Sequence, residues 1–207
     1  MKAFIYTGGA VDVSAITEHP KSDDLRIAAD SGYETAKALG ERVDVLLGDL
    51  DSYKGTLPDG VEIITAPSEK DFTDTQMAIT EALKRGANDI VVIGGLSGRL
   101  DHTLSNVSLL AELSKIRVHA VMTDGQNRVR YLNSTSTLIA RSHFDYLSII
   151  AISDKVKGVS IEGCKYPLKN ATLTRANQYA VSNEIEGNCA LISVRKGECL
   201  IIESRNV

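Results

Sequence analysis

The sequence predicts an α/β domain with a mostly parallel sheet and helices on both faces, followed by an antiparallel β-sandwich domain. In the first part of the chain, short apolar runs alternate with stretches of helical spacing. These runs lack in–out alternation, which is typical of strands buried on both faces of a parallel sheet. After about residue 127 the helical spacing ends, and short β-rich runs with Gly and Asn turns replace it.

The first domain is expected to span residues 1–126, with strands and helices in the order of a Rossmann-like fold. Its strands are expected at residues 2–7, 25–29, 43–47, 61–65, 90–93 and 118–122. Its helices are expected at residues 33–40 and 73–86 and from residue 100. Thr73 and Gln76 have the spacing of a capping box, which marks the start of the second helix. Helical periodicity predicts that the inner face of the third helix consists of Leu100, Leu104, Val107 and Ala111.

The second domain is expected to span residues 127–207 and to contain strands only. The expected strands are residues 128–132, 137–140, 146–152, 156–161, 171–174, 190–194 and 199–202. Repeated short strands with turn residues between them are typical of an antiparallel sandwich.

Composition excludes several classes of function. The net charge is −4 and no dense Lys/Arg run is present, which argues against partners such as nucleic acid or an anionic membrane. The three cysteines are odd in number and widely spaced, which fits neither a disulfide framework nor a zinc site. The first apolar run is shorter than the core of a signal peptide, and no run is long enough to cross a bilayer. We therefore expect a cytoplasmic protein.

Acidic residues follow several of the expected strands: Asp30, the pair Asp49 and Asp51, and Asp124. The carboxyl ends of parallel strands meet at one edge of the sheet, where ligands bind, so these acids are expected to converge. In an extended segment Asp49 and Asp51 point the same way and together can hold Mg²⁺. Alternatively, such aspartates serve only as turn residues.

Asp71 and Asp74 lie near the start of the second helix. Acids at this position are stabilised by the helix dipole, which is sufficient to explain them. A role at a metal ion or as a proton acceptor is the other interpretation.

The segment GGLSGRLDH at residues 94–102 predicts a phosphate site. Its glycines allow the backbone to approach a ligand, and the free N–H groups of the following helix favour an anion. Arg99 can form a forked contact with phosphate oxygens, and Asp101 can reach a metal ion or cap the helix. His102 is assigned no catalytic role. The P-loop and dinucleotide fingerprints are absent, so the residues alone indicate a site for a Mg²⁺-bound phosphate compound, suited to phosphoryl transfer.

Five segments in this order resemble the thiamine pyrophosphokinase family. They are ADSG at residues 29–32, VLLGDLDS at 45–52, KDFTDTQMA at 70–78, GGLSGRLDH at 94–102 and VSNE at 181–184. Each segment is weak alone, but the first four in this order are highly specific. With VSNE, the resemblance covers nearly the whole chain.

The resemblance implies that the hydroxyethyl oxygen of thiamine attacks the β-phosphorus of ATP and that AMP leaves. It implies Mg²⁺ as cofactor, bound near the triphosphate by Asp49, Asp51, Asp74 and Asp101. Asp71 is the candidate base for the hydroxyl group. The residues expected to bind the nucleotide are Asp30, Gly48, Gly95, Ser97, Gly98 and Arg99.

The resemblance also implies a homodimer, with thiamine held between the α/β domain of one subunit and the β domain of the other. Ser182 and Asn183 would bind the pyrimidine ring by hydrogen bonds. Family members often carry a Trp that stacks on thiamine, whereas this chain has Tyr166 and no Trp. A tyrosine ring also stacks on a cationic ring, though less strongly, and ordinary packing is the other interpretation of Tyr166.

Two other functions remain open at this point. One is pyrophosphoryl transfer to another heterocyclic alcohol, such as a pterin. The other is a non-catalytic sensor of nucleotide or thiamine. The full set of acids favours an enzyme over a sensor, and the VSNE segment with its long β domain favours thiamine over a pterin.

Overall fold

The computed structural model describes residues 1–48, 60–65 and 72–206 of the chain. The chain divides into two compact units, Met1–Gly125 and Gln126–Val207. The expected domain boundary, after residue 126, lies one residue from the point where these units meet.

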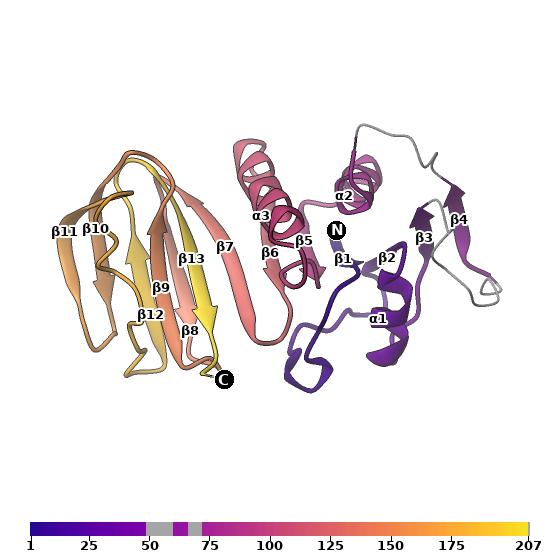
Figure 1. Ribbon diagram of the computed structural model, residues 1–207, viewed down its shortest axis with the longest axis horizontal. Coiled ribbons are helices and arrows are strands. Elements are labelled where there is room, and N and C mark those ends of the chain that lie inside the picture. The colour runs from indigo at the N-terminus through magenta and orange to yellow at the C-terminus, as the bar shows by residue number, and fades with distance from the viewer. Residues whose placement is uncertain (49–59, 66–71, 207) are drawn as a thin grey trace. The chain divides into compact units, whose positions relative to one another are not determined.

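The first unit contains a parallel sheet with the order β4-β3-β2-β1-β5-β6 (Figure 1). Its strands are β1 (Lys2–Tyr6), β2 (Leu25–Ala29), β3 (Val45–Gly48), β4 (Glu62–Thr65), β5 (Asp89–Ile93) and β6 (His119–Thr123). Its helices are α1 (Gly32–Ala38), α2 (Asp74–Lys84), α3 (Leu100–Lys115) and the short 3-10 helix η1 (Val13–Ala15). The predicted α/β class is confirmed, although η1 was not expected from the residue pattern.

Both faces of this sheet are covered, as the continuous apolar runs predict. Phe4, Tyr6 and Ala28 point to one face, where they form a buried cluster with Ala36 of α1. Alternate residues of the same strands point the other way and are also fully buried. Helix α2 packs on β1, β2 and β3, and α3 packs on β6 beside α2, so these two helices cover the face opposite α1 (Figure 1).

Helix α2 begins as its sequence predicts. The hydroxyl oxygen of Thr73 accepts a hydrogen bond of 3.2 Å from the N–H of Gln76. This bond satisfies one of the free donors of the first turn and fixes the start of the helix at Asp74.

The predicted inner face of α3 is wrong at two of its four residues, since only Val107 and Ala111 are half-buried. Leu100 and Leu104 are 69% and 58% exposed. The helix buries Asn106, Leu110 and Leu113 instead. Both sets have helical spacing, so periodicity alone could not choose between them; the position of α3 against β6 decides which set is covered.

The second unit consists of two antiparallel sheets, β7-β13-β9 and β11-β10-β12-β8. Its strands are β7 (Asn127–Asn133), β8 (Ser136–Ala140), β9 (Tyr146–Ala151), β10 (Lys155–Glu162), β11 (Leu168–Thr174), β12 (Cys189–Ser193) and β13 (Glu198–Ser204). Every expected strand is present. One buried cluster includes Ile149 and Ile201 of the first sheet together with Val159 and Ile192 of the second, which is the core of a β-sandwich.

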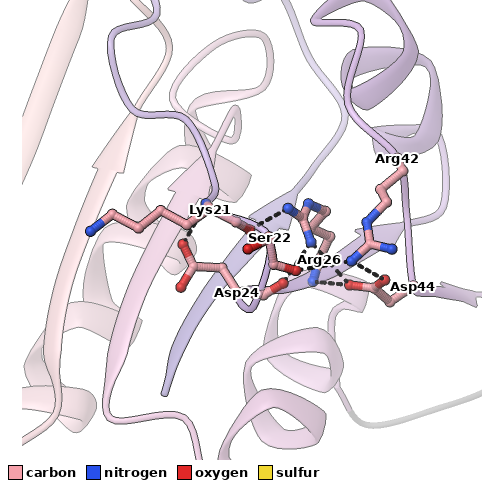
Figure 2. Close-up of polar contacts among 6 residues, drawn as sticks. All are labelled: Lys21, Ser22, Asp24, Arg26, Arg42 and Asp44. Atoms are coloured by element: carbon pink, nitrogen blue, oxygen red, sulfur yellow. Dashed lines mark hydrogen bonds and ion pairs between the residues drawn. The ribbon is translucent and has the colours of Figure 1, made fainter.

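A buried arginine in the first unit ties a surface turn to the sheet. The guanidinium of Arg26 donates hydrogen bonds to the backbone carbonyls of Lys21 and Asp24, and it lies 3.7 Å from the carboxylate of Asp44 (Figure 2). Arg42 lies at the same 3.7 Å from Asp44. The two arginines differ in exposure, because the side chain of Arg26 is 5% exposed and that of Arg42 is 66% exposed.

All three cysteines are free thiols, of which Cys164 and Cys199 are buried. Burial raises the pKa of the Cys199 thiol to about 12. In the part of the chain that the structure describes, no helix has the length and apolar character needed to span a membrane.

We predict that Arg26→Met lowers the free energy of unfolding by about 2 kcal/mol, because the part-buried carbonyls of Lys21 and Asp24 lose their charged donor and Asp44 loses one of its two arginines. Arg42→Met is the matched control. It removes an exposed pair with the same carboxylate and is expected to cost less than about 1 kcal/mol. Urea unfolding of both variants checks this, and equal losses would contradict it.

Candidate active site

A cavity of about 410 Å³ opens at the carboxyl ends of β1, β2 and β5 in the first unit. Residues at the starts of α1, α2 and α3 line it as well. The lining residues are Thr7, Gly8, Gly9, Ala29, Asp30, Ser31, Thr73, Asp74, Thr75, Gly95, Ser97, Gly98, Arg99, His102 and Asn106.

The strand order explains why the cavity lies there. From β1 the chain moves through β2 and β3 to β4 on one side, and then crosses to β5 on the other side of β1. The loops after β1 and β5 therefore leave the sheet in opposite directions and open a crevice between them. In open α/β sheets, ligands bind at such a reversal.

The loops after β1 and β5 are packed against each other. The N–H of Thr7 donates to the carbonyl of Ile93 at 2.9 Å, and the N–H of Gly95 donates to the carbonyl of Gly8 at 3.3 Å. A Cβ atom at Gly94 would lie 2.7 Å from the carbonyl oxygen of Thr7. Only glycine fits at this position, so Gly94 is required by the approach of the two backbones.

Unpaired backbone donors gather in the loop between β5 and α3. Within the described residues, the N–H groups of Leu96, Ser97 and Gly98 make no hydrogen bond. The hydroxyl of Ser97 is engaged, because it donates to the carbonyl of Ala10 at 3.0 Å and so ties this loop to the loop after β1. Free amide groups followed by the positive end of a helix attract an anion such as phosphate.

Two of the predicted acids reach the cavity. Asp30 follows β2, and Asp74 is the first residue of α2. Gly48, at the end of β3, lies beside Asp30, since a Cβ atom built on it would be 3.3 Å from the Asp30 Cα atom. Asp49, Asp51 and Asp71 lie outside the described residues. Asp124 is 7% exposed and is not part of the cavity lining.

Arg99 and Asp101 form a forked ion pair across the start of α3. Arg99 donates from Nε to Oδ1 at 3.1 Å and from a terminal nitrogen to Oδ2 at 2.5 Å. Both side chains are mostly exposed, at 73% and 62%. The hydrogen bonds from Arg99 lower the pKa of the Asp101 carboxyl group, and those to Asp101 raise the pKa of Arg99. Arg99 lines the cavity, whereas Asp101 stands just outside its lining.

The predicted thiamine residues lie in the second unit. Tyr166 is 59% exposed and, together with Tyr179, Val181 and Asn183, borders a small pocket of about 70 Å³. The Asn183 side chain is 3% exposed and holds the loop of Tyr166. Its Oδ1 accepts from the N–H of Tyr166 at 3.0 Å, and its Nδ2 donates to the carbonyl of the same residue at 2.8 Å. Ser182 is exposed and has a φ of 55°.

Sequence reasoning missed several lining residues. Gly8 and Gly9 end the first apolar run, and their place at the strand reversal was the signal that could have singled them out. Asn106 gave a different signal, because it is an amide with the spacing of the buried residues Leu110 and Leu113. Ser31, Thr75 and His102 gave none beyond their position near helix starts.

Comparison with known proteins identifies the family. A family model described as the catalytic domain of thiamin pyrophosphokinase matches residues 17–122, and a model of the vitamin B1 binding domain of the same enzyme matches residues 135–199. The chain belongs to the thiamin pyrophosphokinase family. Its activity is therefore that of a thiamine pyrophosphokinase, and the resemblance found in the motifs is confirmed.

Members of the thiamin pyrophosphokinase family match the chain over its full length. The thiamine pyrophosphokinase of Bacillus subtilis (strain 168) is 28% identical over an alignment of 207 positions, which covers 97% of this chain and 97% of that protein. A crystal structure of thiamine pyrophosphokinase from Bacillus subtilis matches with a TM-score of 0.87 and 26% identity, covering 100% of both chains. A crystal structure of the Geobacillus thermodenitrificans thiamin pyrophosphokinase matches with a TM-score of 0.85 and 26% identity, covering 100% of this chain and 98% of that one.

We predict that Arg99→Gln raises the pKa of the Asp101 carboxyl group toward that of an isolated aspartate, because the forked donor is lost. The ion pair adds stability above the unfolded-state pKa of Asp101 and loses it as the pH falls through the lower folded-state pKa. Titration of the carboxyl carbon by NMR measures the shift. Arg99→Lys keeps the positive charge but loses the forked pair of donors, so the pKa of Asp101 in this variant is expected to lie between those in the unaltered protein and in Arg99→Gln. An unchanged Asp101 pKa in Arg99→Gln would refute the pairing.

Proposed function

We propose that the protein transfers the pyrophosphoryl group of ATP to the hydroxyethyl group of thiamine, giving thiamine diphosphate and AMP. The observation that supports this most is the cavity at the strand reversal. There, free amide donors and an arginine lie near carboxylates, in a chain of the thiamin pyrophosphokinase family. Positive groups suit the phosphate oxygens and carboxylates suit a divalent ion, which is the combination that phosphoryl transfer uses.

The triphosphate would lie along the loop between β5 and α3. The N–H groups of Leu96, Ser97 and Gly98 can donate to phosphate oxygens. Arg99 can exchange Asp101 for phosphate at little cost, because exposed ion pairs contribute about 0–1 kcal/mol. Asp30, Gly48 and Gly95 would line the nucleotide cleft.

The residues present fit Mg²⁺, a cation that prefers oxygen ligands. Asp74 lines the cavity, and Asp49 and Asp51 directly follow Gly48, which lies beside Asp30. Asp49, Asp51, Asp74 and Asp101 would hold the ion. When bound, it would neutralise part of the charge on the triphosphate oxygens.

The proposed reaction requires one proton transfer. The hydroxyethyl oxygen of thiamine bonds to the β-phosphorus, the bond from that phosphorus to the α–β bridging oxygen breaks, and AMP leaves with that oxygen. The hydroxyl proton passes to a carboxylate, for which Asp71 is the proposed acceptor.

Thiamine would contact Tyr166, Ser182 and Asn183. Stacking on Tyr166 suits the positive charge of the thiazolium ring. The hydrogen bonds of Asn183 to the backbone of Tyr166 support a role in holding this ring, with one amide N–H left for the ligand. We propose a homodimer in which the α/β unit of one subunit and the β unit of the other share each site, acting in the reducing cytoplasm, where free thiols persist.

The reaction is tested by incubating the protein with ATP, Mg²⁺ and thiamine and identifying the products by mass spectrometry. We predict thiamine diphosphate and AMP, and loss of turnover by at least about a hundredfold in Asp49→Asn and Asp101→Asn, because ligands of the metal–phosphate complex are removed. Asp23→Asn is the control, since this exposed acid lies outside the cavity.

Several outcomes would contradict the proposal. ADP with thiamine monophosphate would mean a different reaction. Transfer to a pterin but not to thiamine would identify another acceptor. Nucleotide or thiamine binding without any product would indicate a sensor, and full turnover in both aspartate variants would remove the metal assignment.

We predict that mixing two impaired variants restores activity if the site is shared. Asp49→Asn changes only the α/β side of a site, and Tyr166→Ala changes only the β side. When equal amounts of the two variants exchange subunits at random, about half of the dimers are heterodimers. Each heterodimer has one intact site and one doubly altered site, so about a quarter of all sites are intact. Assays at low thiamine concentration measure this, with sedimentation to verify the dimer. No gain on mixing, or a fully active monomer, would rule out the shared site.

A further inference from the structure

A lysine lies over the ring of Tyr166, the residue proposed to stack on thiamine. The Nζ atom of Lys165 is 5.7 Å from the centroid of this ring. This is within the range of about 6 Å in which an aromatic face attracts a cation. Lys165 is not among the residues that line the small pocket beside Tyr166, so the pocket side of the ring stays open to a ligand. A positive charge therefore lies close to the place proposed for the thiazolium ring.

This positive charge opposes the binding of a second cation at the same ring. Two like charges on one side chain repel each other, and the repulsion is stronger near a protein surface than in bulk water. The lysine stays charged, because its hydrogen bond to Glu184 raises the pKa of Lys165. Left unbalanced, Lys165 would weaken the binding of a cationic ligand relative to a neutral ligand of the same shape.

The carboxylate of Glu184 balances the lysine. Its Oε1 accepts a hydrogen bond of 2.8 Å from Nζ of Lys165. The backbones of the two residues are also joined, because the N–H of Lys165 donates to the carbonyl of Glu184 at 2.9 Å. Asn183 accepts a hydrogen bond of 2.9 Å from the N–H of Glu184 and holds the backbone of Tyr166 with the same amide group. One set of contacts thus positions the ring, the cation and the carboxylate.

The ion pair contributes little to the stability of the fold. The side chains of Lys165 and Glu184 are 44% and 45% exposed, and exposed pairs of this kind are weak. Its stronger effect is on the charge beside the ring of Tyr166, where a ligand would be bound.

We propose that Glu184 is a specificity-determining residue, whose carboxylate neutralises Lys165 beside Tyr166 so that the pocket accepts a cationic ring. The inference rests on the proposed function, in that the cation is the thiazolium ring of thiamine stacked on Tyr166. Without this carboxylate the pocket would favour neutral ligands of the same shape.

The test compares two ligands by calorimetry on the full-length protein. One is thiamine, and the other is its neutral thiophene analogue, in which carbon replaces the charged ring nitrogen. Both are titrated with Mg²⁺ and an ATP analogue whose α- and β-phosphates are joined by a methylene group, so that no pyrophosphoryl group is transferred.

The variants are Glu184→Gln and Lys165→Met, alone and together. Glu186→Gln is the matched control. It removes an equal charge two residues away, whereas the lysine is paired with Glu184.

Glu184→Gln is expected to bind thiamine about fivefold more weakly at low salt, since the charge of Lys165 is no longer balanced. The neutral analogue, and thiamine in Glu186→Gln, are expected to bind within about twofold of their affinities for the unaltered protein. Added salt should reduce the loss for thiamine. Lys165→Met is expected to bind thiamine more tightly, because the repelling charge is gone, and the double variant is expected to return close to the unaltered protein.

A merely structural role for the ion pair predicts a different pattern, in which both single variants bind both ligands more weakly. Two results would therefore overturn the inference alone: equal losses for thiamine and its neutral analogue in Glu184→Gln, or unchanged or weaker binding of thiamine in Lys165→Met. If Glu184→Gln does not fold, Lys165→Met decides the question. If the unaltered protein binds neither thiamine nor the analogue, the proposed function fails as well.

Discussion

The close approach of the backbones after β1 and β5 is the constraint on which the site depends. Strand order reverses beside β1, so these two loops leave the sheet in opposite directions and still touch at their bases. A side chain on Gly94 would collide with the carbonyl oxygen of Thr7. Because the contact is between backbones, it fixes where the loop before α3 begins, and with it the position of the free amide groups and of Arg99.

The charges around the cavity follow from that arrangement. Parallel strands place their carboxyl ends on one edge, and right-handed crossovers return each helix so that its N-terminus meets the same edge. Helix starts carry partial positive charge, while the acid Asp30 follows β2 and the acid Asp74 begins α2. Positive groups and carboxylates therefore both line the cavity. Arg99 and Asp101 pair with each other at the start of α3.

Most strands could be read directly from the chain, and the reason is local. A run such as residues 90–93 is apolar throughout because both of its faces are covered, and no helix of that length is stable. The short runs of the second unit are separated by turn residues that end each strand. Helix α3 shows the limit of such reasoning: Leu100 and Leu104 have the spacing of an inner face, yet they are exposed, whereas the polar Asn106 is buried. Periodicity finds a helix, but the neighbours of the helix choose its buried side.

The sequence by itself determined the order of strands and helices, the cap at Thr73, the family motifs and the residue types of the proposed phosphate site, because each depends on a few neighbouring residues. Only the tertiary structure decided that Gly8 and Asn106 line the cavity and that Asp124 does not. It also decided that the hydroxyl of Ser97 donates a hydrogen bond to the carbonyl of Ala10. These outcomes join residues that are distant in the chain. They are set by which strands lie beside β1 and by how α3 packs on the sheet, and no local pattern encodes either.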